Sequence, residues 1–244
     1  MKRESLVMIP GTLCDERIFA QQAKYLRRHC NVILVNYKDL RSLKDWPKHL
    51  LSKLPLNFSV LGFSLGGIWA LELLRQEPRR INRIALIASN AEAASKASSL
   101  RSQKMWANWK VNGPKSVIDE ASKKYFHHDL HLIKHLPLLE DMALKTKSHV
   151  AKMTFEWAAK RPCGHAVISK YRNPILLVSG EKDTMCPKET QKKIVQNNSF
   201  AKWIELPRCG HFIPLEHPKK LNQFLQNWLN TPTSNTKIYH ELHQ

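Results

Sequence analysis

The chain has 244 residues, of which 43% are hydrophobic, and it carries a formal net charge of +19. A chain of this length can bury a sizeable core and favours one large domain over several small ones. No apolar run reaches the roughly 18 to 20 residues that a membrane span requires, so we expect no transmembrane helix. Binding to nucleic acid, to an anionic membrane or to an acidic protein would each explain the positive charge, and so would solubility alone.

The amino-terminal segment Met1–Gly11 has two basic residues and then only a short apolar stretch. That stretch is shorter than the apolar region of a secretory signal, so we interpret it as a first strand. The cysteines form an odd set without a C-x-x-C pair, which favours reduced thiols in a cytoplasmic protein over disulfides or a zinc site. They are Cys14, Cys30, Cys163, Cys186 and Cys209.

Short aliphatic runs recur along the chain and predict buried strands. They lie at Ser5–Ile9, Asn31–Val35, Phe58–Gly62, Arg83–Ser89, Pro174–Gly180 and Ala201–Leu206. Helical patterns lie between most of them, at Glu16–His29, Leu43–Leu54, Leu65–Gln76, Pro187–Gln196 and Pro218–Leu229. Alternating strands and helices favour an α/β fold, with a mainly parallel open sheet that helices cover on both faces.

The alternation stops between residues 91 and 171, where the sequence predicts several helices with breaks at Pro114, Pro137 and Pro162. We expect this segment to be a helical lid inserted into a core of residues 1–90 and 172–230, followed by a polar tail at 231–244. Between positions 91 and 172 there are fifteen lysines and arginines against seven aspartates and glutamates. The excess of positive charge is therefore distributed over both the predicted lid and the core.

The motif Gly62-Phe63-Ser64-Leu65-Gly66 has the form G-x-S-x-G and stands where a predicted strand meets a predicted helix. At such a turn the glycines leave room for a strained backbone, and the serine hydroxyl projects above the sheet. The amide of Leu65, at the helix N-terminus, can donate to an oxyanion. Ser64 is therefore a candidate nucleophile, with an ordinary turn residue as the alternative.

A serine nucleophile needs a base, and the base needs an acceptor that holds its tautomer. Glu181 and Asp183 follow the strand at Pro174–Gly180, and His211 follows the next strand. Active sites of open α/β sheets gather at the carboxyl ends of strands. The chain order is therefore serine, acid, histidine.

Four segments in this order resemble the α/β-hydrolase fold family: PGTLCDE, GFSLGG, SGEKDTMCP and CGHFIPLEHP. The resemblance implies that Ser64 is the nucleophile, Asp183 the acid and His211 the base. It also implies an oxyanion hole made by the amides of Thr12 and Leu65, and a cap formed by the inserted helices. Where many members have histidine and glycine, this chain has Pro10 and Gly11, and it retains the donor amide after the glycine.

Other residues compete for these roles. Asp15, Asp39 and Glu181 are alternatives for the acid, but Asp15 suits a helix N-cap and Asp39 comes too early for the family's order. We expect His217, just before Pro218, to begin a helix.

His128, His131 and His135 fall at i, i+3 and i+7 and raise the alternative of a metal site. Because no companion carboxylate motif accompanies them, we favour a solvated lid face and expect no metal. Tryptophans at 69, 106, 109 and 157 should pack in the core or lid, with one or two lining the acyl pocket. No phosphate loop or dinucleotide fingerprint is present, so we expect no cofactor.

These observations predict a serine hydrolase that cleaves a carboxylic ester through an acyl-enzyme. Its short core and small cap are similar to those of small-molecule esterases of the family, including esterases of biotin synthesis that demethylate a pimeloyl ester on acyl carrier protein. A thioesterase or lyase of the same fold is the alternative enzyme. A non-catalytic basic module that holds nucleic acid is the alternative of another class, although it would need no triad.

The expected partner besides a small acyl ester is an acidic acyl carrier protein, and we expect no nucleic acid. A positive rim at the mouth of an active site would steer such a carrier. The lid lysines predicted to form this rim are Lys123, Lys124, Lys145, Lys147 and Lys152.

Overall fold

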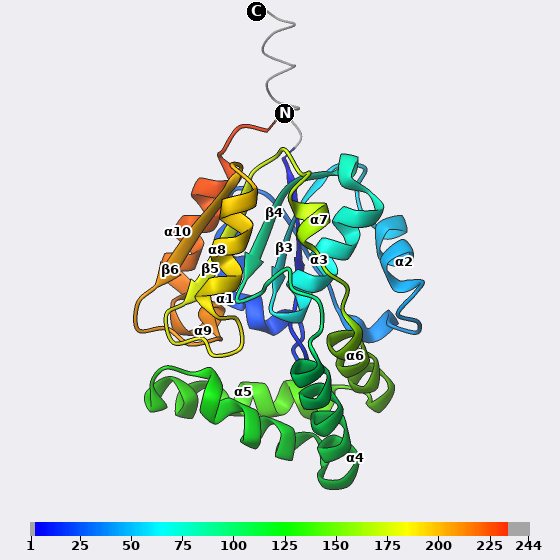
Figure 1. The fold of residues 1–244 in the computed structure, drawn as a ribbon. Helices are drawn as coiled ribbons and strands as arrows, with labels where there is room; N and C mark the ends of the chain where they lie inside the picture. The colour runs from blue at the N-terminus through cyan, green and yellow to red at the C-terminus, as the bar shows by residue number, and fades with distance from the viewer. Residues whose placement is uncertain (1–2, 234–244) are drawn as a thin grey trace, which may run out of the picture.

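The computed structural model describes residues 3–233, so the predicted tail lies outside the described residues from position 234 onward. Six parallel strands form one open sheet in the order β2-β1-β3-β4-β5-β6 (Figure 1). Their bounds are β1 (Ser5–Ile9), β2 (Asn31–Leu34), β3 (Phe58–Phe63), β4 (Ile81–Ile87), β5 (Ile175–Gly180) and β6 (Ala201–Leu206). The predicted parallel α/β sheet is confirmed, with β4 starting two residues earlier than its aliphatic run.

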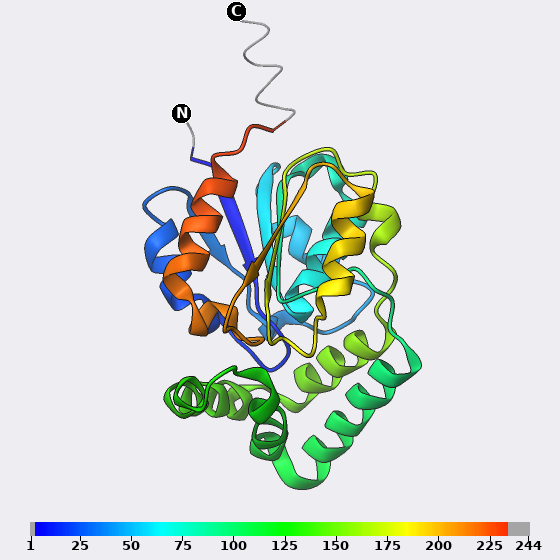
Figure 2. The same ribbon diagram turned by 60° about the vertical axis from the view of Figure 1, so that its left-hand side comes forward.

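Helices cover both faces of the sheet (Figures 1 and 2). One face packs against η1 (Glu16–Phe19), α1 (Ala20–Leu26) and α10 (Pro218–Leu229). The other packs against α2 (Trp46–Lys53), α3 (Leu65–Gln76), α7 (His165–Ile168) and α8 (Lys188–Asn197). Short turns complete the core at η2 (Tyr37–Asp39), η3 (Pro78–Arg80) and α9 (Ile213–Glu216). Among residues 3–233, no helix has both the length and the apolar character needed to cross a membrane.

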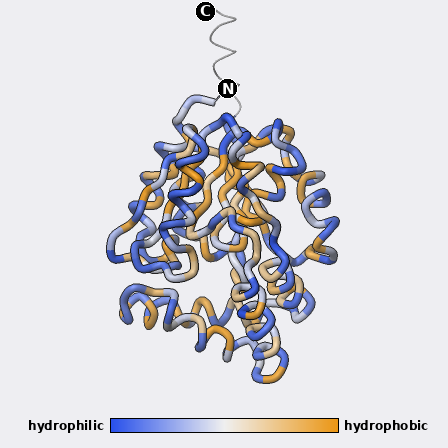
Figure 3. Tube along the Cα trace, viewed as in Figure 1, coloured by the Kyte–Doolittle hydropathy of each residue, from blue (hydrophilic) through white to orange (hydrophobic). Residues whose placement is uncertain are grey.

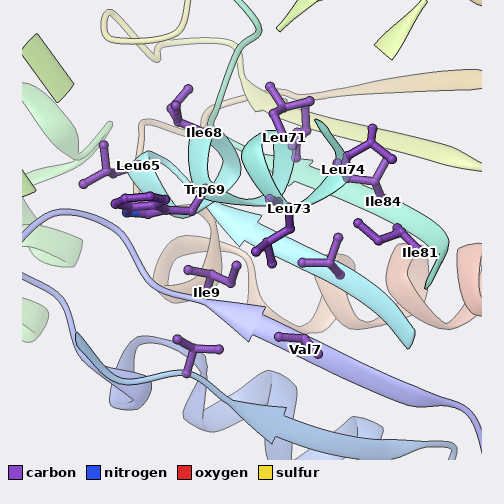
Figure 4. Close-up of a cluster of buried hydrophobic side chains, with 14 of the residues drawn as sticks. Val7, Ile9, Leu65, Ile68, Trp69, Leu71, Leu73, Leu74, Ile81 and Ile84 are labelled. Carbon is purple, nitrogen blue, oxygen red and sulfur yellow. The ribbon is translucent and has the colours of Figure 1, made fainter. Parts of the chain in front are cut away.

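The strands read as continuous apolar runs because both of their faces are buried. Val7 and Ile9 of β1 point into the cluster beneath α3, whereas Leu6 and Met8 point into the cluster beneath α10. Figure 4 shows the first cluster, in which Trp69 and its neighbours on α3 lie over β1 and β4. Figure 3 shows the apolar residues concentrated in the strands at the centre of the molecule.

The segment between β4 and β5 forms three longer helices, α4 (Lys96–Tyr125), α5 (Asp129–Lys145) and α6 (Ser148–Lys160). They lie together at the end of the sheet away from the described chain ends (Figures 1 and 2). A kink divides α4 at Gly113, which has a φ of 80° and precedes Pro114, so the break predicted there is confirmed. Pro162 follows the end of α6.

The break predicted at Pro137 was wrong, because α5 continues through that residue. A proline inside a helix removes one hydrogen bond to the carbonyl four residues earlier. Pro137 is exposed, so water can reach that carbonyl of Ile133. Beyond the proline, Leu139 and Met142 are buried, and their packing holds the last turns of α5 in place.

Candidate active site

Ser64 occupies a strained turn between β3 and α3. Its φ of 52° and ψ of −117° lie in a region that residues other than glycine rarely adopt. A Cβ added at Gly62 would overlap the carbonyl oxygen of Gly66, and one added at Gly66 would overlap that of Ile9. The two glycines therefore allow β3, its turn and α3 to pack closely enough to hold Ser64 at the carboxyl edge of the sheet.

The three predicted triad residues meet at this edge. His211 Nε2 lies 2.9 Å from Ser64 Oγ, and His211 Nδ1 lies 2.9 Å from Asp183 Oδ2. The other carboxylate oxygen of Asp183 accepts hydrogen bonds from the backbone N–H groups of Met185 (2.8 Å) and Cys186 (3.1 Å). These contacts join the loops that follow β3, β5 and β6 into one hydrogen-bonded chain.

The Asp183 carboxyl is buried, yet it is held in its ionised form. Burial raises its pKa, but the His211 ring and the N–H groups of Met185 and Cys186 outweigh that effect, so the pKa lies below the ordinary value of 3.8. A carboxylate at Nδ1 keeps the proton of the neutral imidazole on that nitrogen. Nε2 is then free to accept the proton of Ser64.

Thr12 and Leu65, the predicted oxyanion-hole residues, line the same cavity as Ser64. Leu65 is the first residue of α3, where N–H groups have no partner within the helix. No backbone hydrogen bond in the described part of the chain uses the N–H of Thr12 or Leu65 as a donor. Gly11 lets the loop before Thr12 approach closely, since a Cβ there would lie 3.3 Å from that of Ser64.

The alternative acids have other partners. Asp15 caps η1 through the N–H of Arg17 and forms an ion pair with the same arginine. Glu181 is exposed, accepts from the backbone N–H of Arg208 and pairs with Lys182. The side chain of Asp39 lies outside the described residues.

The three histidines that raised the alternative of a metal site have different neighbours. His128 precedes α5 and its Nδ1 accepts from the N–H of Leu130, while His131 and His135 stack with ring centroids 6.3 Å apart. In residues 3–233, a set of three His, Cys, Asp or Glu ligand atoms within 4.8 Å occurs only at Asp183, Cys186 and His211. Hydrogen bonds already engage all three side chains.

His217 directly precedes α10, as predicted.

The cavity above Ser64 has a largely apolar lining. Its apolar residues are Phe63, Leu65, Ile68, Met105, Tyr125, Phe155, Ala158, Met185 and Phe212. The prediction that one or two tryptophans line it was wrong. Trp69 instead stacks on Trp157 at a centroid distance of 4.2 Å and contacts Trp46, because α3 directs this side chain toward α2 and α6.

Sequence reasoning missed Glu216 and Tyr125, which position the His211 loop. Buried Glu216 accepts from the backbone N–H groups of Gly210 and His127, and the N–H of His211 donates to the carbonyl oxygen of Tyr125 at 2.6 Å. These bonds tie the loop to the connection between α4 and α5. Glu216 stands inside the CGHFIPLEHP segment, but nothing local in that segment reveals its partners.

The predicted carrier-binding lysines divide into two groups. Lys145 and Lys147 line a second groove together with Lys38 and Arg41, next to Leu13 and Cys14, which follow Thr12 in the chain. Lys124 and Lys152 are exposed but do not line this groove, and the side chain of Lys123 lies outside the described residues. Lys145 pairs with Asp141, and Lys152 lies 3.9 Å from Glu156.

Known proteins share the sequence pattern and the fold of this chain. A model of the alpha/beta hydrolase family matches residues 6–224. The chain belongs to the α/β-hydrolase family. This α/β hydrolase is 25% identical over 195 residues to a pimeloyl-[acyl-carrier protein] methyl ester esterase of Aromatoleum aromaticum, covering 73% of this chain and 76% of that protein.

A second similarity is shorter. The protein of the same name from Legionella pneumophila is 33% identical over 90 residues, which is 35% of this α/β hydrolase and 38% of that protein. Among solved structures, the enol-lactonase of Burkholderia xenovorans superposes with a TM-score of 0.82 at 16% identity, covering 95% of this chain and 93% of that one. An esterase of Thermogutta terrifontis superposes with a TM-score of 0.80 at 17% identity, covering 93% and 90%. These superpositions establish the fold.

Proposed function

We propose that the protein is a serine hydrolase that cleaves a carboxylic ester, with Ser64 as nucleophile, His211 as general base and Asp183 as the acid that orients it. The observation that carries the proposal is the chain of two 2.9 Å contacts from Ser64 through His211 to Asp183, next to a cavity. A serine hydroxyl alone is a weak nucleophile at neutral pH, and this arrangement supplies the base that activates it.

The reaction follows from the positions of these groups. His211 Nε2 takes the proton of Ser64 Oγ as that oxygen attacks the ester carbonyl, and the N–H groups of Thr12 and Leu65 stabilise the oxyanion. His211 then gives the proton to the leaving alkoxide, which departs as the alcohol and leaves an acyl-enzyme. His211 next deprotonates a water that attacks the acyl-enzyme, and it returns this proton to Ser64 Oγ as the carbon–Oγ bond breaks and the carboxylic acid is released.

The substrate we infer is a methyl ester at the end of an acyl chain carried on acyl carrier protein, as in pimeloyl ester cleavage for biotin synthesis. The names of the curated relatives support this substrate. The apolar lining of the cavity would suit a hydrocarbon chain. The groove at Lys145 and Lys147 would suit the acidic carrier, because it presents cations beside the oxyanion loop.

On the same proposal, helices α4 to α6 act as a lid on a core of residues 1–90 and 172–230. Ser98, Met105 and Phe155 of α4 and α6 line the cavity that also contains Ser64. Helices in this position shield the acyl-enzyme from bulk water and shape the acyl pocket.

Labelling with a fluorophosphonate tests the proposal directly. The wild-type protein should be modified at Ser64, and the label should be absent from Ser64→Ala. Ser98→Ala is the matched control, since Ser98 lines the same cavity without contacting His211 and should leave labelling intact. A folded wild-type protein that takes no label would favour the non-catalytic binding module.

Turnover of two methyl esters tests the substrate. A methyl ester of an acyl chain on acyl carrier protein should have a KM at least tenfold below that of the same ester free in solution. Equal KM values would remove the carrier from the proposal and leave the ester hydrolase in place.

A further inference from the structure

Two arginines line the cavity that contains Ser64, and neither is paired with a carboxylate. Arg101 comes from α4, and its Nη1 lies 3.6 Å from Met185 Sδ, which is a weak acceptor. Arg161 follows the end of α6; its Nε donates to the carbonyl oxygen of Glu92 at 3.1 Å and its Nη1 to that of Ala158 at 3.0 Å. Within residues 3–233, neither guanidinium forms an ion pair, and Nη2 of Arg161 makes no hydrogen bond.

Acidic side chains do not compensate these charges. No aspartate or glutamate of the described chain lines the cavity. Glu92 is close to Arg161, but its Oε1 contacts His165 at 3.1 Å and Lys193 at 3.0 Å, and the hydrogen bond from Arg161 goes to its backbone oxygen. Burial and the nearby charge of Arg101 lower the pKa of Arg161, and together they outweigh the opposite effects of Cys186 and Glu92. A bound anion would offset both effects.

Hydroxyl groups accompany the two guanidiniums. Ser98, Arg101, Ser102 and Met105 are spaced at i, i+3, i+4 and i+7, so one face of α4 points into the cavity. Ser89 also lines it, and its buried Oγ has no hydrogen-bond partner in the described part of the chain. The cavity thus combines an apolar lining with two guanidiniums that have no carboxylate partner among residues 3–233 and with the unpartnered hydroxyl of Ser89.

We propose that Arg101 and Arg161 bind an anionic group on the substrate itself, a carboxylate or a phosphate, while Ser64 attacks the ester. The proposal rests on the proposed ester hydrolysis and narrows its substrate to esters that carry an acid. Arginine binds such oxyanions through paired N–H donors, and these hydrogen bonds are strong because both partners are charged. On the proposed carrier-bound methyl ester the anion would be the phosphate of the phosphopantetheine arm, whereas on a free half-ester it would be the second carboxylate. In either case the methylene groups would lie along the apolar lining.

Two esters of equal chain length test the proposal, p-nitrophenyl hexanoate and mono-p-nitrophenyl adipate. The wild-type protein should have a KM for the adipate ester about tenfold below that for the hexanoate ester. Arg101→Gln and Arg161→Gln should each remove that advantage, so that the ratio of the two KM values approaches one. Arg101→Lys should retain part of the advantage. Arg79→Gln, which removes the same charge from an exposed turn outside the cavity, is the control.

Adipate and its uncharged diamide, adipamide, as free ligands give a readout that does not need turnover. Adipate should raise the melting temperature of the wild-type protein more than adipamide does, and Arg101→Gln should abolish the difference. Arg101 is exposed and its guanidinium makes no hydrogen bond to the backbone of residues 3–233, so Arg101→Gln tests the site even if Arg161→Gln unfolds the protein by removing the bonds of Arg161 to two backbone carbonyl groups. Pantetheine and 4′-phosphopantetheine as inhibitors form the second arm. An arginine-dependent preference for the phosphorylated compound alone would assign the anion to phosphate.

Equal KM values for the two p-nitrophenyl esters, together with equal stabilisation by adipate and adipamide and equal inhibition by pantetheine and 4′-phosphopantetheine, would overturn the anion site. Hydrolysis of p-nitrophenyl hexanoate would still stand in that case, so the proposed function would survive. Arginine-dependent binding of adipate without hydrolysis of any ester would have the opposite meaning, because it would support the anion site and overturn the hydrolase.

Discussion

Ser64 Oγ and His211 Nε2 lie 2.9 Å apart although 147 positions separate them in the chain. Their meeting depends on the parallel sheet, which places the carboxyl ends of β3 and β6 at one edge. Glu216 then fixes the His211 loop against the α4–α5 connection. The distance between Ser64 and His211 therefore depends on the helical segment between β4 and β5 as well as on the sheet.

Ser64→Ala should lower ester turnover by about 10⁴-fold or more, because the covalent route is lost while the cavity and the oxyanion N–H groups remain. The melting temperature should stay within a few degrees of wild type. Steady-state kinetics on a p-nitrophenyl ester and a thermal melt measure the two quantities. Undiminished turnover would show that Ser64 is not the nucleophile.

Asp183→Asn should lower kcat by roughly 10² to 10⁴-fold, because the carboxamide no longer fixes the His211 tautomer or stabilises the imidazolium. The residual activity should exceed that of His211→Ala, which removes the base itself. Asp39→Asn serves as the comparison. If it lost more activity than Asp183→Asn, the acid would be misassigned.

The stability of the wild-type protein relative to Asp183→Asn should depend on pH. The folded pKa of Asp183 lies below its ordinary value of 3.8, so the carboxylate stabilises the fold above that pH and loses its contribution as the pH falls through the folded pKa. The gap in unfolding free energy should thus be constant near neutral pH and shrink below pH 3.8. Urea denaturation over this pH range measures it, and a gap that stayed constant would contradict the prediction.

Gly66→Ala should destabilise the protein by about 3 kcal/mol or more, because its Cβ would overlap the backbone of β1. Gly113→Ala is the control. Its Cβ would meet open space, and only the backbone conformation, with φ 80° and ψ 176°, is unfavourable, at about 1 to 3 kcal/mol. Chemical denaturation of both variants should show this order, and a reversed order would mean that the turn can open without loss.

Charge reversal at Lys145 and Lys147 should raise KM for a carrier-bound ester about tenfold at low salt, with a smaller effect at high salt. Turnover of a neutral free ester should hardly change, since neither lysine lines the cavity at Ser64. Reversal of Lys188 and Lys192 on α8 alters the net charge equally outside the groove. The same loss in both double variants would point to net charge and not to docking.

The local features of the fold could be predicted from the sequence. β1 and β6 coincide with their predicted bounds, and α10 spans the predicted Pro218–Leu229, because a strand or helix buried in a core needs an apolar pattern over a few neighbouring residues. The turn at Ser64 is also encoded locally, since Gly62 and Gly66 are the residues that its close packing requires.

Only the tertiary structure decided which side chains face the cavity. Trp69 belongs to α3, the helix that follows Ser64, yet its side chain packs against α2 and α6. Arg161 is far from Ser64 in the sequence, yet it lines the cavity without an ionic partner among the described residues. The sequence by itself determined the strands, the serine turn and the chain order of the candidate triad. The cavity lining depends on contacts between distant segments, and those contacts exist only once the helices are packed on the sheet.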